Sequence, residues 1–511
     1  MENQRVRVRF APSPTGPLHM GGVRTALYNY LFAKKHGGDF LLRIEDTDQN
    51  RYVEGAEEYI VDALNWCQMK VDEGISAGGD FGPYKQSERK HLYRQYADQL
   101  IESGNAYCAF DSAEELTEMR ERMKAAGVAS PQYNAITRSG MKNSLTLPTE
   151  EVNKRIEAGE KYVIRIKMPR NEDVKFEDAI RGWVSVNTNH LDDKVLFKSD
   201  GMPTYHLANV VDDYLMKISH VIRGEEWLPS APLHVLLYQF LGWKDVMPTF
   251  AHLPLILKPD GNGKLSKRDG DRLGFPVFPT NWTNPESGEK SSGYKERGYY
   301  PEAFINMLAF LGWNPGTAQE LFTIEELIEA FSLDRVGRAG AKFDFDKTRW
   351  FNQQYLRQKK GEELATQLRP LLNEKNLSAE DDFLAKVCDL MKERATFAED
   401  ILSEGHYFFQ APSCYDEKTV RKKWKEQTPS IMKELRSLLS DLPSFDAESI
   451  GECFKAFLDS KGLGFGAVMP GFRLSVTGLG AGASMNDIAA LLGKEEVLKR
   501  IDKALITIKK N

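Results

Sequence analysis

The stretch that decides the fold is Arg9-Phe10-Ala11-Pro12-Ser13-Pro14-Thr15-Gly16-Pro17-Leu18-His19-Met20-Gly21-Gly22. It overlaps Arg5–Phe10, where apolar and basic residues alternate with the period of a half-buried strand. Three prolines and a glycine then break the strand, and from Val23 the spacing becomes helical until Gly37-Gly38. A second strand-like stretch, Asp39–Asp48, ends in a cluster of carboxylates. This order predicts a β-loop-α-β unit with His19 and two glycines where the helix begins.

The start of the predicted helix has the features of a phosphate-binding site. The first turn of a helix presents unpaired backbone N–H groups and a partial positive charge, both of which favour an anion. Gly21 and Gly22 would let a nucleotide lie close to the backbone, and His19 can donate a hydrogen bond to a phosphate oxygen. The sequence therefore indicates a nucleotide site, although a single histidine after a proline-rich loop is more often structural.

The length and composition limit the class of protein. With 511 residues the chain is too long for one core and suggests about three to five domains. Its 41% hydrophobic and 28% charged residues are ordinary for a globular protein, and no apolar run reaches the ~18 residues of a membrane span. Strand-like sequence starts within five residues of Met1, so we expect no signal or transit peptide.

The cysteines and the net charge indicate which cellular compartment and which binding partners to expect. Five scattered cysteines form no CxxC pair, which argues against a disulfide framework or a zinc cluster and fits a reducing, cytoplasmic location. The net charge is −6, so an RNA-binding function would depend on local basic faces.

Two short motifs carry a resemblance to a known family. His19-Met20-Gly21-Gly22 resembles the HIGH signature of class I aminoacyl-tRNA synthetases, and Lys264-Leu265-Ser266-Lys267-Arg268 resembles their KMSKS loop. The longer string RFAPSPTGPLHMGG…RIEDTD is similar to that of the bacterial-type glutamyl-tRNA synthetases. The resemblance spans nearly the whole chain and is weakest over residues 270–300 and in the middle of the C-terminal half.

The resemblance implies a Rossmann-like α/β catalytic domain with an inserted α/β acceptor-binding domain, followed by all-α anticodon-binding domains. The expected segments are residues 1–110 and 196–258 for the two halves of the catalytic domain, 111–195 for the insert, 259–345 for the KMSKS-like loop with a surface insertion and a stem-contact region, and 346–511 for a helical region with two subdomains. Residues 270–300 are rich in Gly, Pro, Ser and Asn, and we expect a solvated loop or lid there.

The implied activity is a glutamate–tRNA ligase reaction, in which ATP activates glutamate as glutamyl-adenylate before transfer to tRNA(Glu). His19, Lys264 and Lys267 would be the catalytic residues, because this chemistry needs charge neutralisation more than covalent participation. The residues implied for ATP binding are His19, Gly21, Gly22, Glu226, Leu257, Lys264, Leu265, Ser266, Lys267 and Arg268.

Metal ions enter these expectations in two ways. Mg²⁺ is expected to arrive with ATP, and such an ion often has no dedicated protein cage to find in a sequence. Several relatives carry a cysteine-rich zinc knuckle near the start of the insert. Here Cys108 stands alone and Tyr133–Arg138 supplies no thiol, so we expect no zinc and interpret Cys108 as a core residue.

The glutamate pocket is implied by resemblance and agrees with simple electrostatics. Its implied residues are Arg9, Ala11, Ser13, Glu45, Tyr205, Asn209 and Arg223. Glutamate has two carboxylates and one ammonium group, so it needs two cationic partners, here Arg9 and Arg223, and one anionic partner, here Glu45. The competing interpretation of Arg223 is a surface ion pair with Glu225 or Glu226.

The tRNA contacts are less specific. Asp48 and Arg394 align with tRNA-contacting residues of the family, although a helical arginine is usually solvated. The basic cluster Arg421–Lys425, which contains Trp424, could hold phosphates or form a solvated helix face. The family usually acts as a monomer and binds tRNA before it activates the amino acid.

Three alternatives stay open at this stage. An enzyme of the same kind could also charge tRNA(Gln), which would depend on anticodon contacts that the sequence does not locate. A small nucleotidyltransferase that adenylates a carboxylic acid would lack the long helical tail. A non-catalytic RNA-binding relative would be expected to have lost His19 or Lys267, and both are present.

Overall fold

The structure is a computed structural model that describes residues 5–509. The chain divides into two compact units, one made of Met1–Arg297 with Phe304–Phe345 and the other of Gly298–Ala303 with Asp346–Asn511. The expectation that no targeting segment precedes the first strand falls on residues 1–4, which lie outside the described residues.

The first unit is built on two sheets whose strands are parallel except for β7, which pairs antiparallel with β6. One sheet has the order β1-β2-β3, with β1 (Arg7–Phe10), β2 (Asp39–Leu42) and β3 (Glu73–Gly74). The other has the order β7-β6-β10-β9, with β7 (Gly182–Asn187), β6 (Asp173–Asp178), β10 (Thr249–Leu253) and β9 (His220–Gly224). The N–H of Ser219 donates to the carbonyl of Arg7 at 2.9 Å, which sets β9 beside β1. In such folds ligands bind at the carboxyl edge of the strands.

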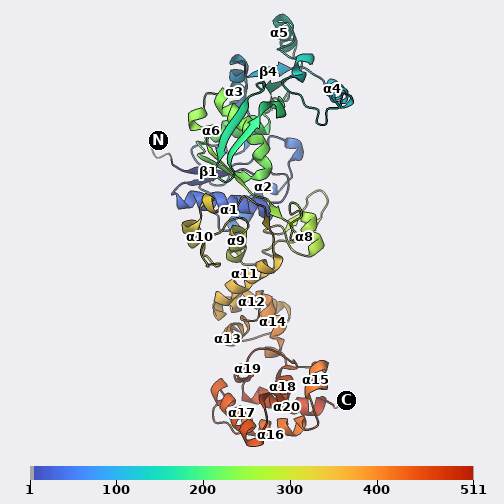
Figure 1. Cartoon of the computed structure of the whole chain (residues 1–511). Helices are drawn as coiled ribbons and strands as arrows, with labels where there is room; N and C mark the ends of the chain where they lie inside the picture. The colour runs from blue at the N-terminus through green and yellow to red at the C-terminus, as the bar shows by residue number, and fades with distance from the viewer. Residues whose placement is uncertain (1–4, 510–511) are drawn as a thin grey trace. The chain divides into compact units, whose positions relative to one another are not determined.

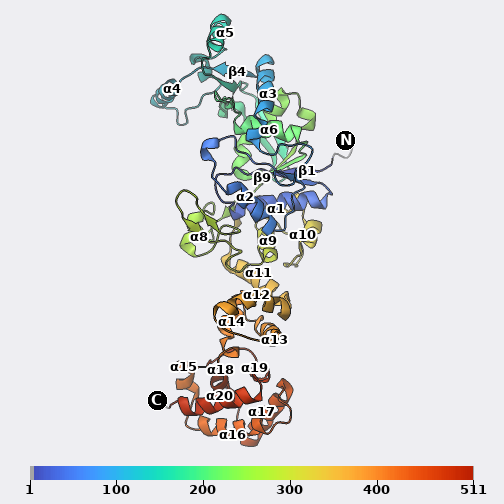
Figure 2. The same cartoon turned by 180° about the vertical axis from the view of Figure 1, so that it is seen from behind.

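Helix α1 (Met20–Lys35) follows β1 and packs on β1, β2 and β9. It begins three residues before the predicted start at Val23, because the side chain of His19 caps it by accepting the N–H of Gly21. Lys34 and Lys35 lie in its last turn, where cations are favourable, and Gly37 follows with φ of 60°. Both views show α1 and α6 (Tyr205–Leu215) on opposite sides of β1 (Figures 1 and 2).

The remaining helices of the first unit pack around these strands. They are α2 (Ala56–Trp66), α3 (Lys90–Glu102), α7 (Ala231–Phe240), α8 (Lys267–Leu273), α9 (Pro301–Ala309) and α10 (Ile324–Ala330). The short strands β11 (Ile256–Leu257) and β14 (Ala341–Lys342) pair in parallel, and β12 (Trp282–Thr283) and β13 (Lys290–Ser291) form an antiparallel hairpin.

The structure divides the expected insert, residues 111–195, between two sheets. Its antiparallel sheet has the order β4-β5-β8, with β4 (Ala106–Ala109), β5 (Val163–Ile166) and β8 (Val195–Phe197), and its helices are α4 (Ala113–Ala125) and α5 (Thr149–Glu157). Strands β6 and β7, which the sequence assigned to the insert, join the catalytic sheet instead, since Asp178 pairs with Phe250 of β10. Local patterns predict these strands but not their partner, which is more than seventy residues away.

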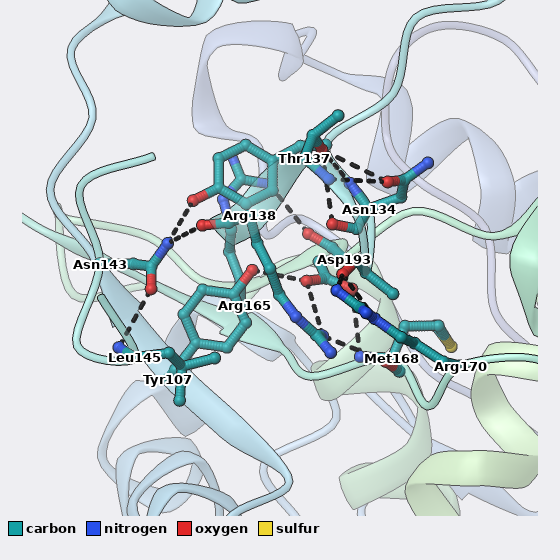
Figure 3. A network of polar contacts seen from close by, with 12 residues as sticks. Tyr107, Asn134, Thr137, Arg138, Asn143, Leu145, Arg165, Met168, Arg170 and Asp193 are labelled. Carbon is teal, nitrogen blue, oxygen red and sulfur yellow. Dashed lines mark hydrogen bonds and ion pairs between the residues drawn. The ribbon is translucent and has the colours of Figure 1, made fainter. Parts of the chain in front are cut away.

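A buried polar network holds the irregular part of the insert together (Figure 3). The carboxylate of Asp193 accepts hydrogen bonds from Tyr107 Oη at 2.6 Å, Arg138 Nη1 at 3.1 Å and the N–H of Met168 at 3.1 Å. Arg165 donates to the Asp193 carbonyl at 2.9 Å. Because buried polar groups are costly when unpaired, these bonds fix a loop that has little regular structure.

The second unit is helical, and its helices bury one face each, as amphipathic sequences predict. Its helices are α11 (Phe345–Gln358), α12 (Gly361–Glu374), α13 (Asp381–Met391), α14 (Ala398–Glu404), α15 (Glu417–Lys423), α16 (Thr428–Ser440), α17 (Ala447–Lys461), α18 (Phe465–Thr477), α19 (Met485–Leu492) and α20 (Lys494–Thr507). None of the helices between residues 5 and 509 is long and apolar enough to cross a membrane.

Candidate active site

A cleft of about 750 Å³ opens at the carboxyl edge of β1 and β9. Most residues that the sequence assigned to ATP and glutamate line it: Arg9, Ala11, Ser13, His19, Gly21, Gly22, Glu45, Tyr205, Asn209, Arg223, Glu226, Lys264, Leu265 and Lys267. They come from segments up to about 250 positions apart in the chain, so the fold brings the two motifs to one place. Leu257, Ser266 and Arg268 do not line the cleft, although they flank residues that do.

His19 is a neutral donor at one end of the cleft. Burial and the nearby charge of Lys264 lower the pKa of His19 to about 4. Nδ1 accepts the N–H of Gly21 at 3.2 Å, so the single ring proton is on Nε2. Among the described residues Nε2 has no hydrogen-bond partner, which leaves this N–H free for a ligand oxygen.

The backbone at the helix start is fixed by close packing. A Cβ added to Gly22 would lie 2.5 Å from Cδ1 of Leu18, so this glycine is needed for the approach of the preceding loop. The N–H of Met20 donates to the carbonyl of Val277 at 2.8 Å, so one of the free donors of the helix start is already used within the protein.

The two lysines of the basic pentad are both paired with carboxylates. Lys264 Nζ lies 2.9 Å from Glu226 Oε1, and Lys267 Nζ lies 2.8 Å from Glu289 Oε1. All four side chains are more than a third exposed, so each pair contributes only about 0–1 kcal/mol and can open readily. The pentad is also less loop-like than expected, since Ser266 caps α8 in a capping box with Asp269 and Lys267 is its first residue.

Residues 270–300 contribute to a wall of the cleft, and the expected solvated loop or lid is exposed over much of its length but has buried aromatic residues. Phe278 and Trp282 are buried and line the cleft. The ring of Phe278 meets His19 edge-on with centroids 6.2 Å apart, and Trp282 packs against Tyr59 at 5.2 Å. Tyr59 Oη also donates to the carbonyl of Thr280 at 2.7 Å. The high glycine and proline content of the segment predicts a loop, whereas a few aromatic residues determine that part of it is buried.

The other end of the cleft holds a buried chain of charges. Arg9 donates to both oxygens of Asp213 at 2.9 and 3.2 Å. Arg43, which is completely buried, donates to Asp213 at 2.7 Å and to Glu45 at 2.9 Å. Asn209 donates to the same oxygen of Glu45 at 3.0 Å. Burial alone would raise the pKa of Asp213, but Arg9 and Arg43 hold it below its usual value, so the carboxylate stays ionised.

Arg223 is a buried cation without an acidic partner. Its side chain donates to Tyr205 Oη and to His252 Nε2, both at 3.0 Å, and all its hydrogen-bond acceptors within residues 5–509 are neutral groups. Glu225 pairs with Arg181 and Glu226 with Lys264, so the competing interpretation of Arg223 as a surface ion pair is wrong. Burial raises the pKa of Tyr205 to about 12, so its phenol stays protonated.

Two important side chains were missed from the sequence. Arg43 begins the quoted string RIEDTD, and Asp213 follows Val210-Val211-Asp212, but no spacing rule joins residues 170 positions apart. Two adjacent aspartates in a helical stretch, such as Asp212 and Asp213, are typical of a solvent-exposed helix face. Burial of both residues is the signal that identifies them, and burial is a property of the tertiary fold.

The residues implied for tRNA binding lie outside this cleft. Asp48 is exposed and precedes a short 3₁₀ turn, and Arg394 is about half exposed with its Nε 4.0 Å from Glu404. In the basic cluster Arg421–Lys425, Trp424 is buried, so its ring is not available to stack on a base.

Cys108 is buried beside Phe110 and Val152 and has the environment of a core residue. Burial raises its pKa, so the thiol is protonated and poorly suited to a metal. Over the described range, residues 5–509, no three side chains of His, Cys, Asp or Glu are grouped to hold a metal ion.

Comparison with known proteins identifies the family. Residues 5–350 match the catalytic domain of class I tRNA synthetases of the E and Q type, and residues 363–505 match an anticodon binding domain. The chain is 57% identical to the glutamate–tRNA ligase of Cytophaga hutchinsonii over 507 residues, which cover 99% of this chain and 98% of that one. It is 56% identical to the glutamate–tRNA ligase of Phocaeicola vulgatus over the full length of both chains.

Solved structures agree with these matches. A crystal structure of a glutamate tRNA ligase from Elizabethkingia meningosepticum, in complex with its amino acid, superimposes with a TM-score of 0.94. The two are 53% identical over 99% of this chain and 100% of that one. The predicted fold class, an α/β catalytic domain followed by a helical anticodon-binding region, is thus confirmed. By sequence and by structure, the chain belongs to the class I tRNA synthetases of the glutamate and glutamine type.

Proposed function

We infer that the chain catalyses the ligation of L-glutamate to tRNA(Glu). ATP and glutamate give glutamyl-adenylate and pyrophosphate, and the glutamyl group then passes to the 3′ end of the tRNA with release of AMP. The relatives named above, all glutamate–tRNA ligases at high identity over the full chain, support this activity. The observation that carries the choice of amino acid is Arg223, a buried cation with no acidic partner among the described residues.

The charges at this end of the cleft match glutamate better than glutamine. Arg9 and Arg43 pair with Asp213 and Glu45, whereas no carboxylate within residues 5–509 pairs with Arg223. Glutamate carries a net charge of −1 and would neutralise it. Glutamine has a neutral side chain and would leave a guanidinium unpaired in a buried site, which is costly.

Each end of glutamate has a partner in this proposal. Arg223, supported by Tyr205, receives one carboxylate. Arg9 uses Nε and Nη2 for Asp213, while no described residue accepts from its Nη1, which is left for the other carboxylate. Glu45, held by Arg43 and Asn209, receives the ammonium group. Ala11 and Ser13, in the loop after β1, complete the wall of the pocket.

The ATP end of the cleft supplies charge and donors. ATP arrives as its magnesium complex, and the triphosphate lies near the start of α1 in this proposal. The Nε2–H of His19 donates to a phosphate oxygen, while Lys264 and Lys267 leave Glu226 and Glu289 to neutralise the charge that develops on pyrophosphate. Ser266 holds the start of α8, and with it Lys267, through its capping box with Asp269.

The reaction proceeds by attack of a glutamate carboxylate oxygen on the α-phosphorus, with departure of pyrophosphate. A hydroxyl group of the terminal tRNA ribose then attacks the carbonyl carbon, and AMP leaves with the bonding electron pair. The protein forms no bond to substrate and acts by placing reactants and stabilising charge.

The wider context follows from the substrates. The helical second unit, with its match to an anticodon binding domain, would contact the tRNA through exposed residues such as Arg394. We expect a monomer that works in the cytoplasm, where ATP and tRNA meet, and that has no zinc.

The decisive assay is charging of purified tRNA(Glu) and tRNA(Gln) with labelled glutamate, with and without ATP, and with labelled glutamine in parallel. We expect ATP-dependent charging of tRNA(Glu) by glutamate alone. Equal charging of tRNA(Gln) would change the tRNA specificity but keep the chemistry. Failure to charge either tRNA with folded protein would refute the proposed function.

A further inference from the structure

Behind Arg223, on the side away from the cleft, three adjacent strands place three buried side chains in line. Asp178 ends β6, His252 lies on β10, and Arg223 lies on β9, with β10 between the other two strands. His252 and Arg223 are direct neighbours in the register of the parallel pair. Asp178, His252 and Arg223 are 1%, 0% and 5% exposed, so solvent does not screen their interactions.

The hydrogen bonds along this line assign the proton on His252. Nδ1 lies 2.6 Å from Asp178 Oδ2, and Arg223 Nε donates to Nε2 at 3.0 Å. Nε2 must therefore carry the lone pair, so the single ring proton is on Nδ1 and points at the carboxylate. Burial lowers the pKa of His252 despite the opposing effect of the Asp178 hydrogen bond, so the ring is neutral.

Asp178 is itself held in place by the backbone. Its Oδ1 accepts the N–H groups of Ile180 at 3.0 Å, Arg181 at 2.8 Å and His252 at 3.3 Å. The two oxygens thus make different contacts. Oδ1 binds the backbone of the turn after β6, and Oδ2 accepts the Nδ1–H of His252 and so determines its tautomer. Hydrogen bonds from His252 and this turn hold the pKa of Asp178 below its usual value, against the effect of burial.

The consequence is a guanidinium with one orientation. The Nε of Arg223 donates a hydrogen bond to His252 Nε2, and its Nη1 donates one to Tyr205 Oη, both at 3.0 Å. A guanidinium is planar, so these two contacts fix its plane beside the cleft, together with longer contacts at 3.4 Å from Nη1 to His234 Nδ1 and from Nη2 to the Trp227 carbonyl. A cation already held in its binding orientation loses little entropy when a carboxylate arrives.

We propose that Asp178 and His252 are positioning residues for amino-acid recognition, which hold Arg223 in the orientation that receives a carboxylate of glutamate. This inference rests on the proposed function, because it takes glutamate as the ligand of Arg223. It adds two residues that do not line the cleft and that come from strands on the side of Arg223 opposite β1.

The first test is Asp178→Asn, which changes one atom of nearly equal size. The amide oxygen can keep the three backbone bonds of Oδ1, and the amide nitrogen then donates to Nδ1. This moves the ring proton to Nε2, where it faces the Nε–H of Arg223, so two donors meet. A flipped amide would instead aim its nitrogen at the backbone N–H groups. The flipped amide loses three backbone bonds at once, so the first arrangement is favoured, and that arrangement disturbs Arg223.

The expected result is a separation of the two substrates. In pyrophosphate exchange with saturating tRNA, the variant should raise the KM for glutamate about 5–150-fold, from the ~1–3 kcal/mol lost at an unsatisfied buried group. The KM for ATP should stay within about twofold of that of the parent protein. Asp193→Asn, the same change at a buried aspartate of the insert, is the matched control and should leave the KM for glutamate unchanged.

The second test asks whether the two residues act in series. In His252→Gln the side-chain oxygen can accept from Arg223 whatever Asp178 does, so the KM for glutamate should stay close to that of the parent protein. Adding Asp178→Asn to His252→Gln should then have little further effect. His252→Leu, which removes the acceptor, should raise the KM for glutamate like Asp178→Asn does.

NMR of protein with ¹⁵N-labelled histidine tests the tautomer without any activity. We expect the His252 proton on Nδ1 in the parent protein and on Nε2 in Asp178→Asn. A proton on Nε2 in the parent protein, an unchanged KM for glutamate in folded Asp178→Asn, or equal losses for ATP and glutamate would each overturn the inference. Failure of the parent protein to charge tRNA with glutamate would instead refute the proposed function and leave the NMR result standing.

Discussion

Arg43→Met is the most direct test of the buried charge chain, because within residues 5–509 Arg43 is the residue that donates hydrogen bonds to both Asp213 and Glu45. The side chain is completely buried and donates to the two carboxylates at 2.7 and 2.9 Å. Methionine fills most of the volume but supplies no charge. Within residues 5–509, Asp213 then keeps Arg9 as its one side-chain donor, and Glu45 keeps the neutral amide of Asn209.

The size of the effect follows from this loss. Removing one partner of a buried ion pair costs about 3–5 kcal/mol, because the other charge is left uncompensated. For a unit of this size such a loss should lower the melting temperature by about 5–10 °C. The pocket also loses one positive charge, which weakens its attraction for a ligand of net charge −1, so the KM for glutamate should rise at least about tenfold, or ~1.4 kcal/mol.

Calorimetry and pyrophosphate exchange measure the two effects. The transition of the first unit can be recognised because added ATP should raise its temperature. Arg94→Met is the control, since Arg94 and Asp98 form an exposed i,i+4 pair for which about 0.3–0.5 kcal/mol is expected. Arg43→Lys should recover part of both losses, because one ammonium can serve one carboxylate well. A folded Arg43→Met protein with unchanged melting temperature and KM for glutamate would refute the reasoning.

Three further outcomes are expected. Lys267→Ala should lower the maximal rate of pyrophosphate exchange at least about tenfold, by loss of a charge-assisted contact of ~1.5–3 kcal/mol, with the KM for glutamate nearly unchanged; a large rise in that KM would contradict the triphosphate role. The pKa of His19 is lowered to about 4, so between pH 4 and 6.5 this residue binds fewer protons in the folded protein than in the unfolded chain. Its contribution to the free energy of unfolding should therefore be full above pH 6.5 and fall as the pH drops toward 4. An NMR titration of His19 with a midpoint near pH 6.5 would contradict this. Asp193→Ala leaves Arg138 and Tyr107 without their acceptor and should destabilise the insert by about 3–5 kcal/mol, measured as faster proteolysis within residues 111–170; equal protection of the variant and the parent protein would show that the network is dispensable.

The sequence by itself determined the local structure around its motifs. Strand β1, the proline-rich loop and helix α1 follow from alternation, chain-breaking residues and helical spacing, all of which act within a few residues. The helical second half follows for the same reason. The two lysines and His19 were found because short motifs preserve their spacing, and the fold then places all three on one cleft.

Only the tertiary structure decided which distant charges meet and which polar segments are buried. Arg43 and Asp213 are 170 positions apart, and Asp178 and His252 are 74 positions apart, so no local pattern links them. Residues 270–300 have the composition of a loop, yet Phe278 and Trp282 bury their rings beside His19 and Tyr59. Strand β6 lies within the residues expected to form the insert but pairs with β10 of the catalytic sheet. In each case the partner of a side chain or strand comes from a distant part of the chain, and burial in the folded protein selects that partner. The local sequence determines only the backbone conformation around each residue.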